Sequence, residues 1–290
     1  MESSPVAPHG VRIVVAYDGT DFAGWQEQPE QRTVQSVIEA AVSGMSGHAV
    51  KIRGAGRTDS GVHAEGQVAA FDSARLIPPR GWMLGLNQRL PEDVAVRAAF
   101  ECAPGYNPRY DALDKLYRYV LLLGEARDPH WRGRAWHVAR VHTDGEGSRR
   151  LDLDALHAGA AQFVGTHDFG AFRASDDERT MTVRTIHDVQ ILPEYLGNPD
   201  LLAIEVRGTA FLKQMVRILV GTLLEVGRGK RSPESLPALL LPGADRGSTG
   251  ITAPAHGLSM VRVRLGKKDA ERSATEDAER IAAAAERKPG

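Results

Sequence analysis

The stretch GAGRTDSGVHA, residues 54–64, places an Arg-Thr-Asp run between glycines. It joins two apolar segments, 50–56 and 63–72, whose composition favours β-strands. We therefore expect a hairpin with this stretch at or near its tip. Glycine-rich loops commonly hold phosphates, and a carboxylate at the centre of such a loop would repel a phosphate. The role of Asp59 is the question that the stretch raises.

The segments around this hairpin predict one half of the protein. A β-branched strand over 11–18 and a helix over 33–47, with Thr33 as its N-cap, come before the hairpin. A helix over 80–91 and a strand over 94–102 follow it. This β-α-β-β-α-β order is that of a ferredoxin-like unit, whose open sheet face can receive a large ligand.

A second run of similar elements follows a connector over 103–113. It predicts strands over 115–124, 180–194, 201–210 and 258–265, and helices over 152–165, 211–229 and 232–241. We therefore expect an α+β protein of two ferredoxin-like halves, 11–105 and 106–266, with sheets joined around a central catalytic cleft. We assign no role to the N-terminal extension (1–10) or to the charged, Ala-rich tail (267–290).

Composition narrows the possible classes of function but does not identify one. The net charge is −1, so bulk charge does not indicate a nucleic-acid binder, although 29 of the 36 basic residues are arginine. Arginine suits phosphate binding, but a GC-rich genome explains the bias at least as well. The single cysteine, Cys102, excludes an internal disulfide framework and a multi-cysteine metal site. With no apolar run of membrane-spanning length and no signal peptide, we expect a cytoplasmic protein.

Several known loop signatures fail on the opening stretch. A dinucleotide fingerprint would need glycine where Asp59 stands, and a nucleophile elbow would need glycine where Thr58 stands. His63-Ala64-Glu65 matches the H-x-E part of a zinc deaminase signature, but the P-C-x-x-C part is absent, because the chain has only one cysteine. Aspartate in a glycine-bounded turn most often caps its own backbone. Arg57, two residues earlier, indicates more than this local role.

Seven motifs together resemble the TruA family of tRNA pseudouridine synthases, and the resemblance covers about residues 11–265. They are YDGTDFAGWQ (17–26), RTVQ (32–35), GAGRTDSGVHA (54–64), KLYRY (115–119), HDFGAFR (167–173), FLKQMVR (211–217) and TAPAHGL (252–258). The most diagnostic is RTDSGVHA, because the catalytic loop of this family reads R-T-D-x-G-V-H-A.

The resemblance implies an isomerase that converts uridine to pseudouridine at positions 38–40 of the tRNA anticodon arm. It implies no metal and no cofactor, and a homodimer in which one tRNA contacts both subunits. Two alternatives remain: a non-catalytic tRNA-binding protein on the same fold, and a small-molecule enzyme that uses the glycine loop for phosphate.

The resemblance also implies roles for individual residues. Asp59 matches the family nucleophile, which attacks either the sugar carbon or the uracil ring. Arg57 would fill the space left by a flipped-out base and hold a phosphate, with Thr58 as a further RNA contact. Tyr117 would stack on the base or relay the proton from C5. Arg217 would be the cationic partner of Asp59.

Other polar and aromatic residues of the motifs receive lesser roles. Lys213 lies one turn before Arg217 on the expected helix, so both would share a face and Lys213 would bind RNA. Tyr119 is expected in the core and His63 as a hydrogen-bonding brace. Phe172 and Arg173 would support the cleft, and His167 would act as a cap.

Overall fold

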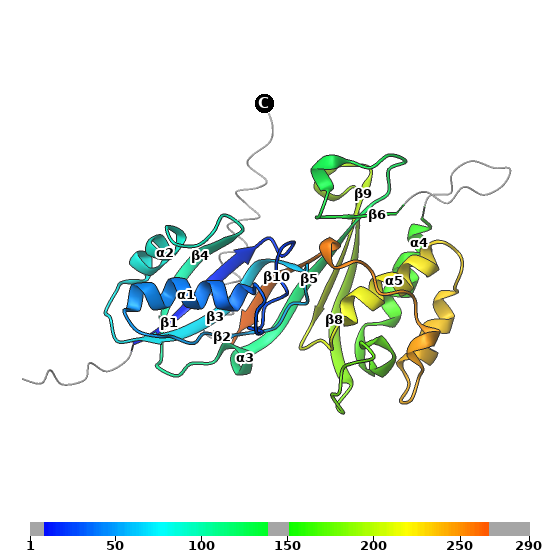
Figure 1. The fold of residues 1–290 in the computed structure, drawn as a ribbon. Helices are drawn as coiled ribbons and strands as arrows, with labels where there is room; N and C mark the ends of the chain where they lie inside the picture. The colour runs from blue at the N-terminus through cyan, green and yellow to red at the C-terminus, as the bar shows by residue number, and fades with distance from the viewer. Residues whose placement is uncertain (1–8, 139–150, 267–290) are drawn as a thin grey trace, which may run out of the picture.

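The structure is a computed structural model that describes residues 9–138 and 151–266. The 267–290 tail and nearly all of the N-terminal extension lie outside the described residues. Within them, ten strands form one continuous sheet, with the main order β4-β1-β3-β10-β5-β9-β8-β7 (Figure 1). Two short strands lie off this path: β2 pairs with β3, and β6 pairs with β5.

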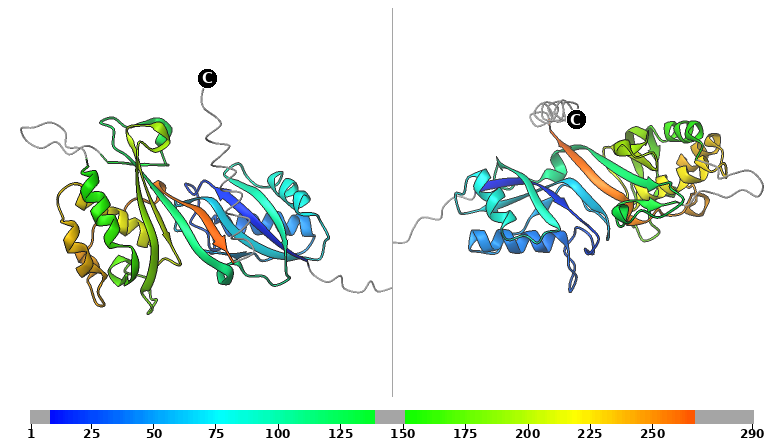
Figure 2. Two further views of the ribbon diagram at one scale, coloured as in Figure 1. Left: turned by 180° about the vertical axis from the view of Figure 1, so that it is seen from behind. Right: turned by 90° about the horizontal axis from the view of Figure 1, so that it is seen from above.

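The first half confirms the expected ferredoxin-like order. Its elements are β1 (His9–Tyr17), α1 (Val34–Ser46), β2 (Arg53–Gly54), β3 (His63–Ser73), α2 (Pro79–Asn87) and β4 (Val94–Cys102). The strands pair in the order β4-β1-β3-β2, all antiparallel, which places each strand next to the partner that this topology requires. Both helices cover the same face of this half (Figures 1 and 2).

The second half repeats the same arrangement. Its elements are β5 (Ala112–Leu122), α4 (Leu153–Gln162), β8 (Val183–Pro193), β9 (Leu201–Gly208), α5 (Met215–Gly227) and β10 (Leu258–Leu265). The order β10-β5-β9-β8 is that of β4-β1-β3-β2 in the first half. The halves meet where β10 pairs in parallel with β3, with Ser259 opposite His63. The α+β class with two joined sheets is therefore confirmed.

Several elements differ from the sequence expectation. The structure adds α3 (Pro108–Asp111), β6 (Trp136–His137) and β7 (Gly165–Asp168). The segment expected as a helix over 232–241 is a 3-10 helix, Pro233–Leu240, because Pro237 has no N–H to donate within an α-helix. Shorter 3-10 turns are Pro129–Trp131, Gly170–Phe172, Tyr195–Gly197, Arg246–Ser248 and Ala255–Gly257.

The core lies between the sheet and its helices. In the first half Phe71 of β3 meets Trp82 of α2 edge to face, with ring centroids 5.0 Å apart. In the second half Phe163 and Phe172 make the same kind of contact at 5.3 Å. Tyr119 is fully buried and donates its hydroxyl hydrogen to the Pro254 carbonyl at 2.8 Å, which confirms its expected place in the core.

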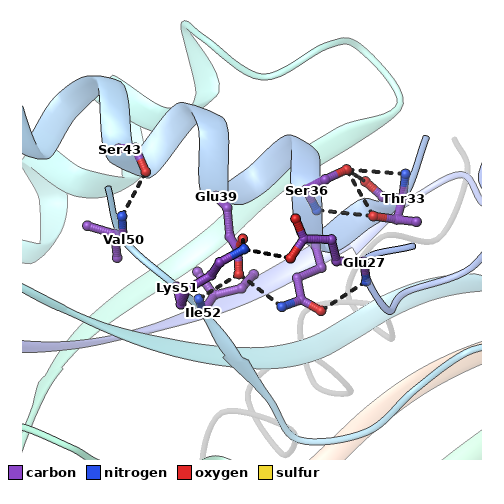
Figure 3. A network of polar contacts seen from close by, with 9 residues as sticks. Glu27, Thr33, Ser36, Glu39, Ser43, Val50, Lys51 and Ile52 are labelled. Atoms are coloured by element: carbon purple, nitrogen blue, oxygen red, sulfur yellow. Dashed lines mark hydrogen bonds and ion pairs between the residues drawn. The ribbon is translucent and has the colours of Figure 1, made fainter. Parts of the chain in front are cut away.

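A buried carboxylate ties α1 to the chain on either side of it (Figure 3). Glu39 is 6% exposed and accepts hydrogen bonds from the Ile52 backbone N–H at 3.0 Å and the Gln35 amide at 2.9 Å. Gln35 in turn accepts from the Glu27 backbone N–H at 3.2 Å. Lys51 bridges Glu39 and Glu27 from the surface. The network thus fixes the loop that leads into α1.

Replacing Glu39 by alanine should lower the free energy of unfolding by about 1–3 kcal/mol, because two buried donors lose their acceptor. Glu27→Ala is the matched control, since Glu27 binds the same lysine at the surface, and it should cost less than about 1 kcal/mol. Urea unfolding of the two variants measures both values. Equal losses would show that the buried acceptor is not what stabilises this corner.

Candidate active site

The loop that carries Asp59 is packed into the protein. Strand β2 is only two residues long, and Arg53 pairs with Ala70 while Gly54 pairs with Ala69. The expected hairpin is therefore confirmed, with residues 55–62 as the loop at its tip, although β2 is shorter than the strand predicted over 50–56. The loop is held inward because the Trp25 backbone N–H donates to the Thr58 carbonyl at 3.0 Å. Tertiary contacts, rather than strand pairing, fix its path.

A turn inside this loop sets the direction of Asp59. The Val62 N–H donates to the Asp59 carbonyl at 3.2 Å, and Gly61 adopts φ +77°, a conformation that glycine adopts without strain. The Ser60 hydroxyl donates to the Phe22 carbonyl at 3.1 Å. Backbone and neighbouring groups thus close the turn, and the Asp59 carboxylate extends to the second half of the protein.

Arg217, from the first turns of α5, is the cation that meets Asp59. Its Nη1 lies 3.6 Å from Asp59 Oδ2, with 13% of the arginine side chain and 29% of the aspartate side chain exposed. The Arg217 Nε donates to the Ala253 carbonyl at 2.7 Å, and the Ala253 N–H donates back to the Arg217 carbonyl at 3.1 Å. The TAPAHGL segment therefore holds the guanidinium in place independently of its contact with Asp59.

Burial dominates the electrostatics of Asp59. Desolvation raises the pKa of its carboxyl, and the nearby charges of Arg217 and Lys213 lower it only in part. The net pKa lies above the ordinary value for aspartate. Burial therefore outweighs the two neighbouring cations in setting the pKa of Asp59.

Lys213 does not lie on the helix, which corrects the expectation for residues 211–214. Helix α5 begins at Met215, because Gln214 has φ 60° and interrupts a helical path. The Lys213 ammonium forms an ion pair with Asp176 at 2.6 Å, and its backbone N–H donates to Asp177 at 3.0 Å. It is nevertheless near enough to Asp59 to lower the pKa of that carboxyl.

Tyr117, on β5, lies near enough to Asp59 for the two side chains to interact electrostatically. Its side chain is 7% exposed and meets Phe211 edge to face at a centroid distance of 5.0 Å. Burial raises the pKa of the phenol, and electrostatic interactions with Tyr17 and Asp59 raise it further. The hydroxyl is therefore protonated at neutral pH, so it can donate or accept a hydrogen bond and relay a proton, but it does not act as a phenolate base.

Arg57 and Thr58 point in different directions. Arg57 is exposed. Thr58 is 6% exposed, and its hydroxyl lies 2.7 Å from the Tyr17 hydroxyl. This burial does not fit the RNA contact expected of the Thr58 side chain. Tyr17 belongs to a motif quoted from the sequence, but nothing in that motif indicated that its phenol holds the loop.

The histidines of the motifs form hydrogen bonds with backbone groups. His63 accepts from the Gly19 N–H through Nδ1 and donates through Nε2 to the His256 carbonyl, each at 3.0 Å. This is the brace expected for His63, and it links the two halves. His167 bonds the Val164 carbonyl at 3.0 Å, outside the cluster around Asp59. Phe172 lies in the core, whereas the Arg173 guanidinium donates to the Arg179 carbonyl.

Metal-binding clusters and membrane-spanning helices are both absent from the residues that the structure describes. Residues 9–138 and 151–266 contain no group of three or more His, Cys, Asp or Glu side chains that could hold a metal ion. In the same residues, no helix has both the length and the apolar character to cross a membrane.

Comparison with known proteins decides the family. The family model described as tRNA pseudouridine synthase matches residues 13–111 and 160–265. The chain belongs to the tRNA pseudouridine synthase family. Members of this family are isomerases, so the cluster of Asp59, Arg217 and Tyr117 is part of an enzyme that acts on tRNA.

Bacterial members of the tRNA pseudouridine synthase family match along nearly their whole length. The tRNA pseudouridine synthase A of Geotalea uraniireducens is 44% identical over 253 residues, 87% of this chain and 98% of that protein. That of Halalkalibacterium halodurans is 42% identical over 249 residues, 86% of this chain and 89% of that protein. A Cbf5-Nop10-Gar1 complex aligns with a TM-score of 0.35 and 12% identity over 87% of this chain and 58% of that one, too low to inform the fold.

Proposed function

We propose that this enzyme converts uridine to pseudouridine at positions 38–40 of the tRNA anticodon arm, with Asp59 as the nucleophile on a flipped-out base. One observation carries the proposal: the Asp59 carboxylate lies half-buried where the two halves meet, 3.6 Å from a fixed guanidinium. A carboxylate so placed is partly sheltered from water, and with 29% of its side chain exposed it can still be reached by a base. The motif match to the family's catalytic loop supports the same assignment.

The target base has to leave the anticodon stem before it can reach Asp59. Flipping a nucleotide out of a stack costs a few kcal/mol, which contacts in the cleft must offset. Arg57 is exposed on the same loop as Asp59, two residues earlier. Its side chain is therefore in position to occupy the space that the base leaves.

The reaction itself is a balanced isomerisation. The bond from N1 to C1′ breaks, the base turns, and a bond from C5 to C1′ forms. The proton on C5 is lost and N1 gains one, so no external oxidant, reductant or nucleotide is consumed. Asp59 assists by attacking C1′ or the uracil ring, and Arg217 stabilises the carboxylate when it is released.

Tyr117 is the residue best placed for the proton step. Its phenol is protonated, and it lies close enough to Asp59 for that carboxylate to raise the pKa of the phenol. Tyr117→Phe keeps the ring contact with Phe211 and removes only the hydroxyl. We expect the turnover to fall by roughly 10²–10⁴-fold. Single-turnover kinetics at saturating RNA measure this, and an unchanged rate would remove the proton-relay role.

The test of the overall proposal uses unmodified tRNA transcripts labelled with tritium at C5 of uridine. Purified protein with no added cofactor should release tritium to water as pseudouridine forms. Transcripts with cytidine at positions 38, 39 and 40 should release none. Release that is unaffected by these changes would contradict the assigned positions, and binding without any release would indicate a non-catalytic tRNA-binding protein.

The same proposal extends to the state of the enzyme in the cell. We infer a cytoplasmic homodimer in which one tRNA contacts both subunits, on the strength of the family resemblance. Sedimentation of the protein with and without tRNA tests this, and a monomer that retains full activity would contradict it.

A further inference from the structure

Lys115 lies on the face of the sheet that carries the site. It stands two residues before Tyr117 on β5, and side chains two residues apart on a strand share a face. Its neighbour Asp114 faces the opposite way, where it binds Arg264 through a hydrogen bond of 2.7 Å and lies 3.8 Å from Arg207. The one carboxylate adjacent in sequence is therefore unavailable to the Lys115 ammonium.

In residues 9–138 and 151–266, the Lys115 ammonium has no anionic partner. Among the described residues, it forms no ion pair or hydrogen bond. The residues opposite it on the flanking strands, Val263 of β10 and Gly208 of β9, carry no charge. The charged group near it is Arg109 of α3, a second cation, which is exposed and also has no side-chain partner in the described part of the chain.

This placement is unfavourable in the free protein. Burial and, to a smaller extent, the positive charge of Arg109 together lower the pKa of the Lys115 ammonium to about 8. Two neighbouring cations with no carboxylate between them repel each other. A bound anion would reverse both effects, because it would compensate the desolvated charge and screen the repulsion.

The catalytic loop approaches Lys115 closely. A Cβ atom at Gly56 would lie 3.0 Å from the Lys115 Nζ and 3.4 Å from the Met260 side chain. Glycine at this position therefore leaves room for the ammonium against the loop. Gly56 immediately precedes Arg57, so the cation lies beside the segment that we expect to enter the RNA stem. Figure 1 shows α3, the start of β5 and β2 next to one another at this place.

We propose that Lys115 and Arg109 bind a backbone phosphate of the substrate RNA. This phosphate belongs to the RNA strand that holds the target nucleotide, and it binds on one side of the catalytic loop. The inference rests on the proposed entry of the target uridine at Asp59. It adds a positioning site: the two cations hold the RNA strand while Arg57 and Asp59 act on the flipped nucleotide. Phosphate is the anion that tRNA presents at every residue of its backbone.

The first test compares RNA affinity in three lysine and arginine variants. Lys115→Met and Arg109→Met should each weaken binding of an anticodon stem-loop roughly tenfold, and should each reduce the slope of log affinity against log salt by about 0.7–0.9. Lys230→Met, at an exposed position of the second half, is the matched control and should change neither value. Fluorescence anisotropy in an Asp59→Asn background measures binding without turnover.

The second test separates this site from the chemistry. In the active enzyme, Lys115→Met should raise KM about tenfold and leave kcat at saturating tRNA within about twofold. The variant should be no less stable than the parent, because folding disfavours the charged lysine. A fall in kcat with unchanged affinity would overturn the phosphate role, and it would do so without affecting the proposed function, which Asp59→Asn tests.

The third test uses pH. Above about pH 8 the unbound Lys115 loses its charge, so the affinity of the parent protein for RNA should fall as pH rises to about 9. Lys115→Arg keeps its charge over this range, and its affinity should stay flat. Parallel pH curves for the parent and the arginine variant would overturn the proposal, as would wild-type affinity and salt slope in Lys115→Met.

Discussion

Asp59→Asn should abolish pseudouridine formation, with a loss of at least about 10⁴-fold in rate, while the affinity for tRNA stays within a few-fold. Asparagine has nearly the shape of aspartate, but its amide is a poor nucleophile. The backbone contacts of the loop, from Val62 to Asp59 and from Trp25 to Thr58, do not involve the carboxylate and should persist. Tritium release and stem-loop affinity, measured on one preparation, check both halves of this expectation.

The same variant carries a stability signature. The pKa of Asp59 is raised by burial, so folding favours the protonated carboxyl. Stability from this group is fully present below the unfolded-state pKa and is lost as pH rises through the folded-state pKa. At neutral pH the ionised Asp59 is therefore a cost. Asp59→Asn should melt at the same temperature as the parent or slightly higher, and a marked decrease would mean that the carboxylate is a structural group.

Arg217→Met should give the second largest effect, a loss of about 10²-fold or more at neutral pH. The guanidinium 3.6 Å from Asp59 lowers the pKa of that carboxyl, which burial raises. Without it the pKa rises further, so a larger fraction of Asp59 is protonated and inactive. Activity should recover in part as pH increases, and the acidic limb of the pH–rate profile should move to higher pH.

The pH dependence distinguishes charge from structure. Arg217 also bonds the Ala253 carbonyl, so its removal could displace the TAPAHGL segment. Arg217→Lys restores the charge without the Nε hydrogen bond to Ala253 and should return the acidic limb toward that of the parent. A loss of activity that is equal at all pH values, and equal in both variants, would show that Arg217 acts only as a brace.

Strand order was the most predictable part of the fold. Alternating apolar segments of the right length identify β1, β3, β4, β8 and β9, and the β-α-β-β-α-β sequence fixes how they pair. Residues 211–214 were misassigned to a helix. The local pattern extends the helix through them, but the left-handed backbone at Gln214 interrupts the regular structure. The strand expected over 50–56 is likewise longer than β2, Arg53–Gly54.

Local motifs predicted which residues make up the site, and the fold determined how they are arranged. The pairing of Asp59 with Arg217 was expected from the two motifs, and the structure brings them together. The inward turn of Thr58 depends on Tyr17, 41 residues away, and no local pattern encodes it. Lys115 could not be identified as a binding residue from the sequence, because its lack of an ionic partner among the described residues is visible only in the folded structure.

Single-turnover conversion at saturating enzyme tests the central claim most directly. With all of the tRNA bound, the rate reports chemistry at the flipped uridine and not affinity. The account predicts full conversion by the parent protein and no detectable pseudouridine with Asp59→Asn after times several hundred-fold longer. A rate for Asp59→Asn within about tenfold of the parent would contradict the assignment of Asp59 as the nucleophile.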